Sequence, residues 1–165
     1  SATALDITRE LGRPDVPASV RKNALRLEKR LTSPGREIEP VLSDILGSGT
    51  KWIEQNDQFT VLYTWSDTSP GSWLQAKELM ILAPEKVNFY GLFTGDDESV
   101  IESISARAEM PGTQLSGEAR RLRAVADELG VGTSFPIYVI NPSGTVAFVA
   151  TSLVGLPEKI RKLKK

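Results

Sequence analysis

The sequence predicts an α/β domain with a mixed central sheet and helices on both faces. Two apolar runs, residues 59–65 and 87–93, are rich in β-branched and aromatic side chains, as expected of buried strands. Between them, residues 73–82 repeat apolar side chains with a helical period. A later group of segments follows the order strand, turn, strand and helix. The length of 165 residues is that of one compact domain.

Residues 1–35 are expected to form a helical extension in front of a main domain of residues 36–165. Four apolar side chains at helical spacing form one stripe, namely Val20, Ala24, Leu27 and Leu31. Pro17 favours a helix start, and Pro34-Gly35 favours its end. We expect this extension to dock on the main domain or on another molecule.

The main domain is predicted to open with a β-hairpin. Residues 37–42 and 51–54 are short segments on either side of Gly47-Ser48-Gly49. Two strands joined by a glycine-containing loop have this pattern. The hairpin would precede the core strand at residues 59–65.

The later elements are predicted from apolar periodicity and from residues that end helices. Gly130 follows a helical stripe directly, as at a C′ position, and Asn141-Pro-Ser-Gly144 has the composition of a tight turn. In chain order we expect helices over 96–110 and 118–129, strands over 137–140 and 145–149, and a helix over 156–163.

Composition excludes several kinds of chemistry. The chain has no cysteine and no histidine, which removes disulfides, thiolate nucleophiles, cysteine-type zinc sites and the commonest general base. A Ser-His-Asp or Cys-His catalytic group is therefore impossible. The acidic run Asp96-Asp97-Glu98 opens a predicted helix, where carboxylates favour the helix dipole. We expect no metal site and no cofactor.

The charge pattern favours no polyanionic partner. Twenty basic and twenty-one acidic residues give a net charge of −1, so no overall field attracts nucleic acid or membrane. Basic residues concentrate in 9–36 and 159–165, as solvated helix faces do. We expect no nucleic-acid partner, and membrane contact only through a segment that would precede residue 1.

The loop of residues 66–72, here called the motif loop, is the strongest candidate for a site. It joins a buried strand to a helix, and ligands of α/β sheets gather beyond the carboxyl ends of strands. The helix start adds free N–H groups and a partial positive charge. Trp65-Ser-Asp-Thr-Ser69-Pro-Gly-Ser72 resembles the Trp-x-x-x-Cys-x-x-Cys segment of the thioredoxin superfamily, with serine at both cysteine positions.

A second stretch carries the same resemblance. Phe135-Pro136-Ile-Tyr-Val-Ile-Asn-Pro-Ser-Gly-Thr-Val is similar to the proline, strand and turn segment of that superfamily, and this implies a cis bond before Pro136. The expected hairpin resembles that of the exported TlpA-like redoxins. The resemblance covers about residues 36–165 and implies a thioredoxin-like fold. It favours an extracytoplasmic or organellar lumen as the compartment.

A related family is also similar. Ser69-Pro70-Gly71-Ser72 resembles the Thr-Pro-Gly-Cys of thioredoxin-dependent peroxidases, the AhpC/TSA-related redoxins, and this would put Ser72 at the peroxidatic position. Those proteins usually lack the later proline and carry an arginine before the late strand. Here Phe135-Pro136 stands at that place with no adjacent arginine. The thiol-reductase branch is the better match.

The family's reaction needs thiols. Its first cysteine attacks as a thiolate stabilised by the helix start, and its second resolves the mixed disulfide. The resemblance therefore places Ser69 at the attacking position, Ser72 at the resolving position and Pro136 beside the substrate. Serine hydroxyls form no disulfide, so the chain as written is inactive in thiol–disulfide exchange.

Two functions remain open from the sequence. The first is a redox-inactive module that binds a polypeptide in a groove beside Pro136, with a lining of Trp65, Pro70, Gly71, Trp73 and Phe135. The second is a Cys-to-Ser form of an active thiol–disulfide reductase or, less favoured, of a peroxidase. The simpler interpretation makes the two serines helix N-caps and the aromatic residues packing groups. Nothing in the sequence indicates the oligomeric state.

Overall fold

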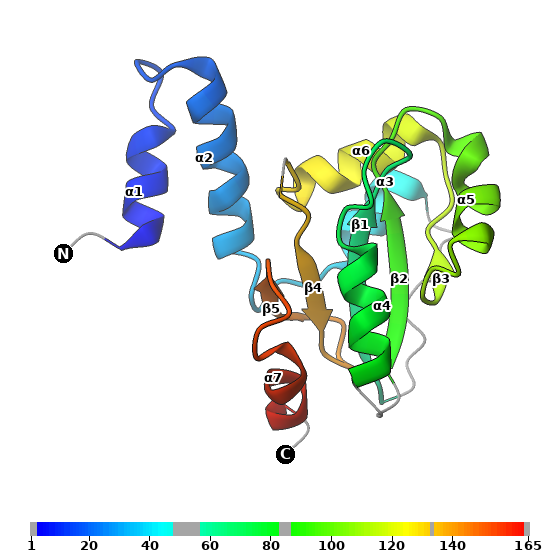
Figure 1. Cartoon of the computed structure of the whole chain (residues 1–165). Coiled ribbons are helices and arrows are strands. Elements are labelled where there is room, and N and C mark those ends of the chain that lie inside the picture. The colour runs from blue at the N-terminus through cyan, green and yellow to red at the C-terminus, as the bar shows by residue number, and fades with distance from the viewer. Residues whose placement is uncertain (1–2, 48–56, 83–86, 133, 164–165) are drawn as a thin grey trace.

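The computed structural model describes residues 3–47, 57–82, 87–132 and 134–163. A five-stranded mixed sheet forms its centre, in the order β3-β2-β1-β4-β5 (Figure 1). The strands are β1 (Phe59–Trp65), β2 (Val87–Phe93), β3 (Thr113–Gln114), β4 (Ile137–Ile140) and β5 (Val146–Ala150). Strand β1 runs parallel to β2 and antiparallel to β4, and β5 returns antiparallel to β4. The predicted mixed α/β architecture is confirmed.

Strand β1 is the central strand, and all seven of its residues are buried. It is in register with β2 along its whole length, from Phe59 opposite Val87 to Trp65 opposite Phe93. Both strands therefore end at the same edge of the sheet. This edge is where the motif loop leaves β1.

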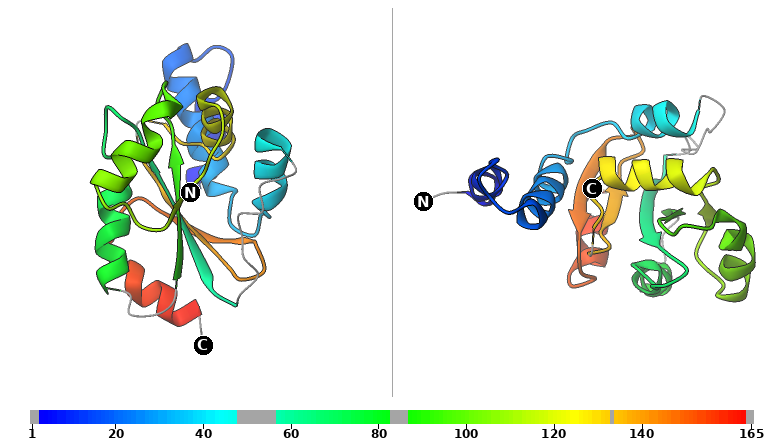
Figure 2. Two further views of the ribbon diagram at one scale, coloured as in Figure 1. Left: turned by 90° about the vertical axis from the view of Figure 1, so that its right-hand side faces the viewer. Right: turned by 90° about the horizontal axis from the view of Figure 1, so that it is seen from above.

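Helices cover both faces of the sheet. Helices α4, α5 and α7 lie on one face, and α3 and α6 lie on the other (Figure 2). Their bounds are α3 (Glu39–Leu46), α4 (Trp73–Leu82), α5 (Ile101–Arg107), α6 (Ala119–Glu128) and α7 (Leu156–Leu163). None of the helices in the described ranges is long and apolar enough to cross a membrane.

The predicted N-terminal hairpin is replaced by a different arrangement. Glu37 makes an isolated bridge with Thr145 beside β5, and the chain then enters α3. The N-cap residue Ile38 is buried together with Val41 and Leu42 of the helix. These residues stand at positions i, i+3 and i+4, which share one face of a helix. The predicted second strand, residues 51–54, lies outside the described residues.

The helix predicted over residues 96–110 is shorter and begins as a 3-10 turn at Glu98–Val100. The carboxylate of Asp97 accepts a hydrogen bond from the backbone N–H of Ser99 at 3.0 Å. The Ser99 hydroxyl donates to the same carboxylate oxygen at 2.6 Å. This hydroxyl bond, followed by the backbone bond, lowers the pKa of Asp97. In the described part of the chain, no group of three or more acidic side chains is arranged to hold a metal ion.

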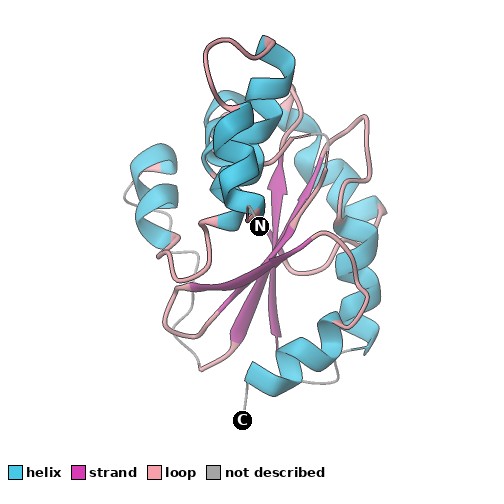
Figure 3. Ribbon diagram, turned by 90° about the vertical axis from the view of Figure 1, so that its left-hand side faces the viewer, coloured by secondary structure: helices cyan, strands magenta, loops and turns pink. Residues whose placement is uncertain are grey.

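Helices α1 (Ala4–Leu11) and α2 (Ala18–Leu31) form a helical pair, here called the arm. The arm lies beyond the β5 side of the sheet, with α1 farther out than α2 (Figures 1 and 3). Helix α1 is stabilised by a capping box between Thr3 and Asp6. It lies within residues 1–35, which the sequence predicts to be a helical extension, but outside the stripe that marks α2.

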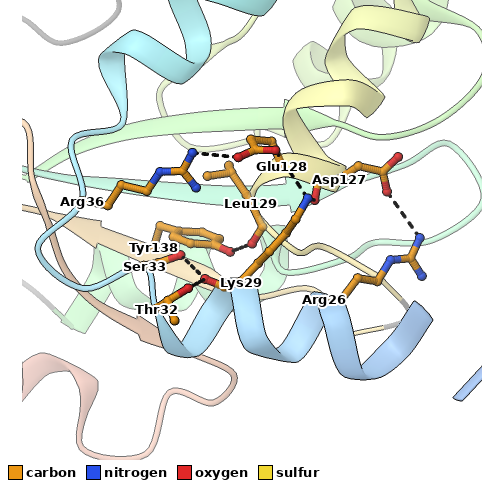
Figure 4. A network of polar contacts seen from close by, with 9 residues as sticks. All are labelled: Arg26, Lys29, Thr32, Ser33, Arg36, Asp127, Glu128, Leu129 and Tyr138. Carbon is orange, nitrogen blue, oxygen red and sulfur yellow. Dashed lines mark hydrogen bonds and ion pairs between the residues drawn. The ribbon is translucent and has the colours of Figure 1, made fainter. Parts of the chain in front are cut away.

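Helix α2 docks on the end of α6 through polar contacts (Figure 4). Lys29 Nζ donates to the backbone oxygen of Asp127 at 3.0 Å, at the negative end of the α6 dipole. Arg36 Nη2 donates to Glu128 Oε1 at 2.7 Å. This bond is the main cause that lowers the pKa of Glu128 below its ordinary value. Ionic and backbone contacts, rather than the predicted apolar stripe, therefore hold the arm.

A glycine permits the close approach between α2 and α6. Gly130 has φ +75° and ends α6 as predicted, with Val131 N–H bonded to the Ala126 oxygen at 2.8 Å. A Cβ at Gly130 would lie 2.3 Å from the backbone oxygen of Arg26. Only glycine fits both the backbone conformation and this contact.

Candidate functional site

The motif loop turns back on itself directly after β1. The backbone N–H of Ser66 donates to the oxygen of Ser69 at 3.0 Å, which closes a small turn. Ser69 is half-buried, and its hydroxyl accepts the N–H of Gly71 at 3.3 Å. Pro70 is exposed, and its backbone oxygen accepts the N–H of Trp73 at 3.2 Å as α4 begins. The loop thus presents Ser69 and Pro70 outward.

Ser72 has the opposite environment. Its side chain is completely buried, and its hydroxyl oxygen accepts the backbone N–H of Thr64 at 2.9 Å. The same hydroxyl lies 3.2 Å from the Thr64 oxygen and 3.5 Å from the Pro136 oxygen. Ser72 therefore ties the loop to β1 and to the Pro136 segment, and its hydroxyl bonds run back to the sheet rather than into the first turn of α4.

Gly71 lies where the motif loop meets the stretch that begins with Phe135 and Pro136. It has φ +56°, and a Cβ there would lie 2.1 Å from the Thr64 oxygen and 2.9 Å from Phe135 Cδ1. The Phe135 ring therefore packs against the loop backbone. Residues 64 chain positions apart thus lie together at one end of the sheet.

The expected cis bond before Pro136 is absent. No peptide bond among the described residues is cis, so Phe135–Pro136 is trans. The trans isomer is favoured intrinsically by about 0.5–1 kcal/mol at X–Pro bonds. Pro136 is nevertheless buried beside Ser72, directly before β4.

The aromatic residues of the expected groove have different environments. Trp65 is fully buried and donates through Nε1 to Gln114 Oε1 at 2.8 Å, so it belongs to the core. Trp73 is partly buried against the same core, with Lys77 Nζ 6.0 Å from its ring centroid. Phe135 is half-buried. Of the three aromatic residues, Phe135 contacts the motif loop and lines a hollow.

That hollow, here called the loop groove, has a volume of about 360 Å³. Thr94 lines it and bonds to the oxygen of Trp65, the residue before the motif loop, through its backbone N–H at 2.8 Å. Phe135 connects this groove with the motif loop, because its ring lines the groove and packs against Gly71, although no residue of the motif loop itself lines it. Two cationic side chains, Arg26 and Arg123, line the same groove. They are paired with Asp127 and Asp96 respectively. Sequence reasoning missed Thr94 and both arginines, since residues on four separate elements meet here only after folding.

A series of linked side-chain hydrogen bonds supports this end of the sheet. Tyr63 donates to the Pro111 oxygen at 2.8 Å and accepts from Gln114 Nε2 at 2.8 Å. Burial raises the pKa of Tyr63 to about 12. Gln114 connects this hydroxyl to Trp65 and so fixes the end of β1.

The site contains no activated nucleophile. Ser69 and Ser72 are bonded to backbone groups, whereas a serine nucleophile needs an adjacent base. The chain has no cysteine, so its own side chains cannot carry out thiol–disulfide exchange.

Comparison with known proteins finds similarity at the level of the fold. No protein-family model and no curated protein sequence matches the chain. A thioredoxin-like protein from Parabacteroides distasonis is 14% identical with a TM-score of 0.53, covering 70% of this chain and 89% of its own. A thiol:disulfide interchange protein from Bacteroides sp. is 12% identical with a TM-score of 0.54, covering 78% and 83%.

A third solved structure is a secreted disulfide oxidoreductase from Mycobacterium tuberculosis. It is 16% identical with a TM-score of 0.50, and the match covers 82% of this chain and 98% of the other. Together with the sheet order, these similarities define the fold. The chain has a thioredoxin-like fold, and Ser69 and Ser72 stand where the sequence resemblance places cysteines.

Proposed function

We propose that this domain is a redox-inactive binding module that holds an extended polypeptide in the loop groove. One observation carries the proposal: Phe135 packs on Gly71 of the motif loop and also lines the loop groove. This contact supports a binding surface that extends from the groove to the loop. The proposed surface combines the groove lining around Phe135 with the adjacent Ser69, Pro70 and Gly71. The buried Ser72 and Pro136 hold the loop in place.

The experiment uses an unfolded probe without disulfides, namely reduced and carboxymethylated α-lactalbumin. Titration into ¹⁵N-labelled protein should shift the amide signals of residues 69–73 and 134–137. Phe135→Ala should weaken binding at least tenfold, because it removes the half-buried ring that lines the groove. Phe148→Ala is the matched control, since Phe148 is also half-buried but lies on β5. Absence of binding, or equal loss in both variants, would contradict the proposal.

A second candidate function is a thiol–disulfide reductase in its Cys-to-Ser form. The different exposure of the two serines favours it, because a half-buried Ser69 and a buried Ser72 suit an attacking and a resolving thiol respectively. The double variant Ser69→Cys/Ser72→Cys should then reduce insulin disulfides with dithiothreitol as the electron donor. A double variant that folds and shows no reduction above dithiothreitol alone would remove this candidate.

A further inference from the structure

The arm leaves most of its apolar side chains exposed. Of the stripe predicted on α2, only Ala24 is buried, while Val20 is 40% exposed, Leu27 38% and Leu31 41%. From α1, Leu11 is 41% exposed. Because α2 docks through its charged flank, the domain itself does not cover this stripe. An apolar surface left open in this way is typical of an interaction site.

The exposed side chains line a hollow of about 380 Å³, here called the arm groove. One wall comes from α1 through Leu11, and the other from α2 through Val20 and Leu27. Gly130, Gly132 and Ser134 of the loop before β4 close its end. A concave apolar groove between helices suits a ridge of side chains on a partner helix.

The charge of the arm identifies the complementary partner. Residues 3–36 contain eight basic and four acidic side chains, a net charge of +4 in a chain whose total is −1. Arg30 lines the arm groove and makes no ion pair within the described ranges, unlike Arg26, Lys29 and Arg36. Its guanidinium donates to Ser134 Oγ, and its buried Nε has no hydrogen-bond partner. A carboxylate from outside would pair with the part of this guanidinium that lines the arm groove.

We propose that the arm groove binds an acidic amphipathic helix of another protein. Apolar side chains of that helix occupy the space between Leu11, Val20 and Leu27, and a carboxylate at its edge pairs with Arg30. The arm groove adjoins the loop groove, since Arg26 and Gly132 line both. The proposal stands on the arm alone and does not require a polypeptide in the loop groove.

Two other occupants fit less well. A membrane surface is flat, whereas the groove is concave, and residues 1–35 lack the tryptophan and phenylalanine typical of interfacial helices. A second copy placed by two-fold symmetry would bring together two arms that each carry a net positive charge. An acidic helix meets both the apolar and the electrostatic requirement.

The test uses a fluorescein-labelled synthetic 18-residue helix with leucine along one face and glutamate beside it. Fluorescence anisotropy with the full chain should give saturable binding, and the same peptide with lysine for glutamate should bind at least tenfold more weakly. Leu27→Asp and Arg30→Gln should each weaken binding at least tenfold. Leu74→Asp is the matched control, because Leu74 is 53% exposed on α4 and lies far along the chain from the arm.

A further variant and circular dichroism separate binding in the arm groove from the loop groove and from folding. Phe135→Ala should leave binding of this peptide unchanged even if it abolishes binding of the unfolded probe. Circular dichroism confirms that each variant is folded.

Three results would overturn the proposal. In the first, the glutamate peptide binds no more tightly than the lysine peptide. In the second, the protein binds phosphatidylglycerol vesicles in place of the peptide, and this binding depends on Leu27. In the third, sedimentation equilibrium shows dimerisation that depends on Leu27. The last two would assign the arm groove to a membrane or to a second copy.

Discussion

The hydroxyl oxygen of Ser72 accepts the backbone N–H of Thr64 at 2.9 Å, and both groups are buried. Pairing of β1 with β4 ends at Leu62 opposite Tyr138. Ser72 therefore bonds to a backbone donor of β1 beyond the last residue that is paired with β4. A residue placed by sequence at a catalytic position thus has a structural role in the serine form.

Replacement of Ser72 by alanine should lower the free energy of unfolding by about 1–3 kcal/mol, because a buried N–H loses its acceptor. Urea unfolding followed by tryptophan fluorescence measures the change. Ser69→Ala is the control and should cost less than about 0.5 kcal/mol, since Ser69 is half-buried and its bond to Gly71 is long at 3.3 Å. Equal effects of the two variants would contradict a special role for Ser72.

Alanine at Gly71 should destabilise the protein by more than about 2 kcal/mol, through a positive φ and a Cβ 2.1 Å from the Thr64 oxygen. Gly35→Ala separates the two causes, because Gly35 has φ +84° with nothing within 4 Å of a Cβ. It should cost only about 1 kcal/mol. Thermal unfolding of both variants provides the comparison, and equal losses would refute the steric contact.

Stability should fall as the pH rises from 10 to 12, in part through Tyr63. Its pKa is raised from 10.0 to about 12 by burial, so the folded state retains a proton that the unfolded state releases. The stabilisation is complete below pH 10 and is lost as the pH rises through the folded value. The free energy of unfolding of Tyr63→Phe should therefore fall less over this range. Below pH 10 it should already be about 1–3 kcal/mol lower than that of the wild type, because Gln114 and Pro111 lose their hydrogen-bond partner.

Docking of the arm should weaken at acid pH through Glu128. The Arg36 hydrogen bond lowers the pKa of Glu128 below its ordinary value of 4.5, so its contribution is complete above that value and is lost as the pH falls through the folded pKa. Hydrogen exchange of α2 amides should be faster in Glu128→Gln than in the wild type at pH 7, and the difference should narrow at pH 3.

The control for this measurement is Glu158→Gln, because Glu158 lies on α7, where it pairs with Arg161 at 3.9 Å. It should leave exchange in α2 unchanged at both pH values. A difference between wild type and Glu128→Gln that persists at pH 3 would assign the effect to packing of the side chain rather than to its charge.

The sequence by itself determined the elements whose signals are local. Apolar runs specified β1, β2 and β4, helical periodicity specified α4 and α7, and Gly130 specified the end of α6. The absence of cysteine excluded thiol chemistry without any structure.

Only the tertiary structure decided how these elements meet. It buried Trp65, left Phe135 at the loop groove and kept the bond before Pro136 trans. It also turned the charged flank of α2, rather than its apolar stripe, toward the domain. Periodicity shows that a helix has an apolar face but not what covers it, because that depends on contacts between residues about 100 positions apart, such as Lys29 and Asp127.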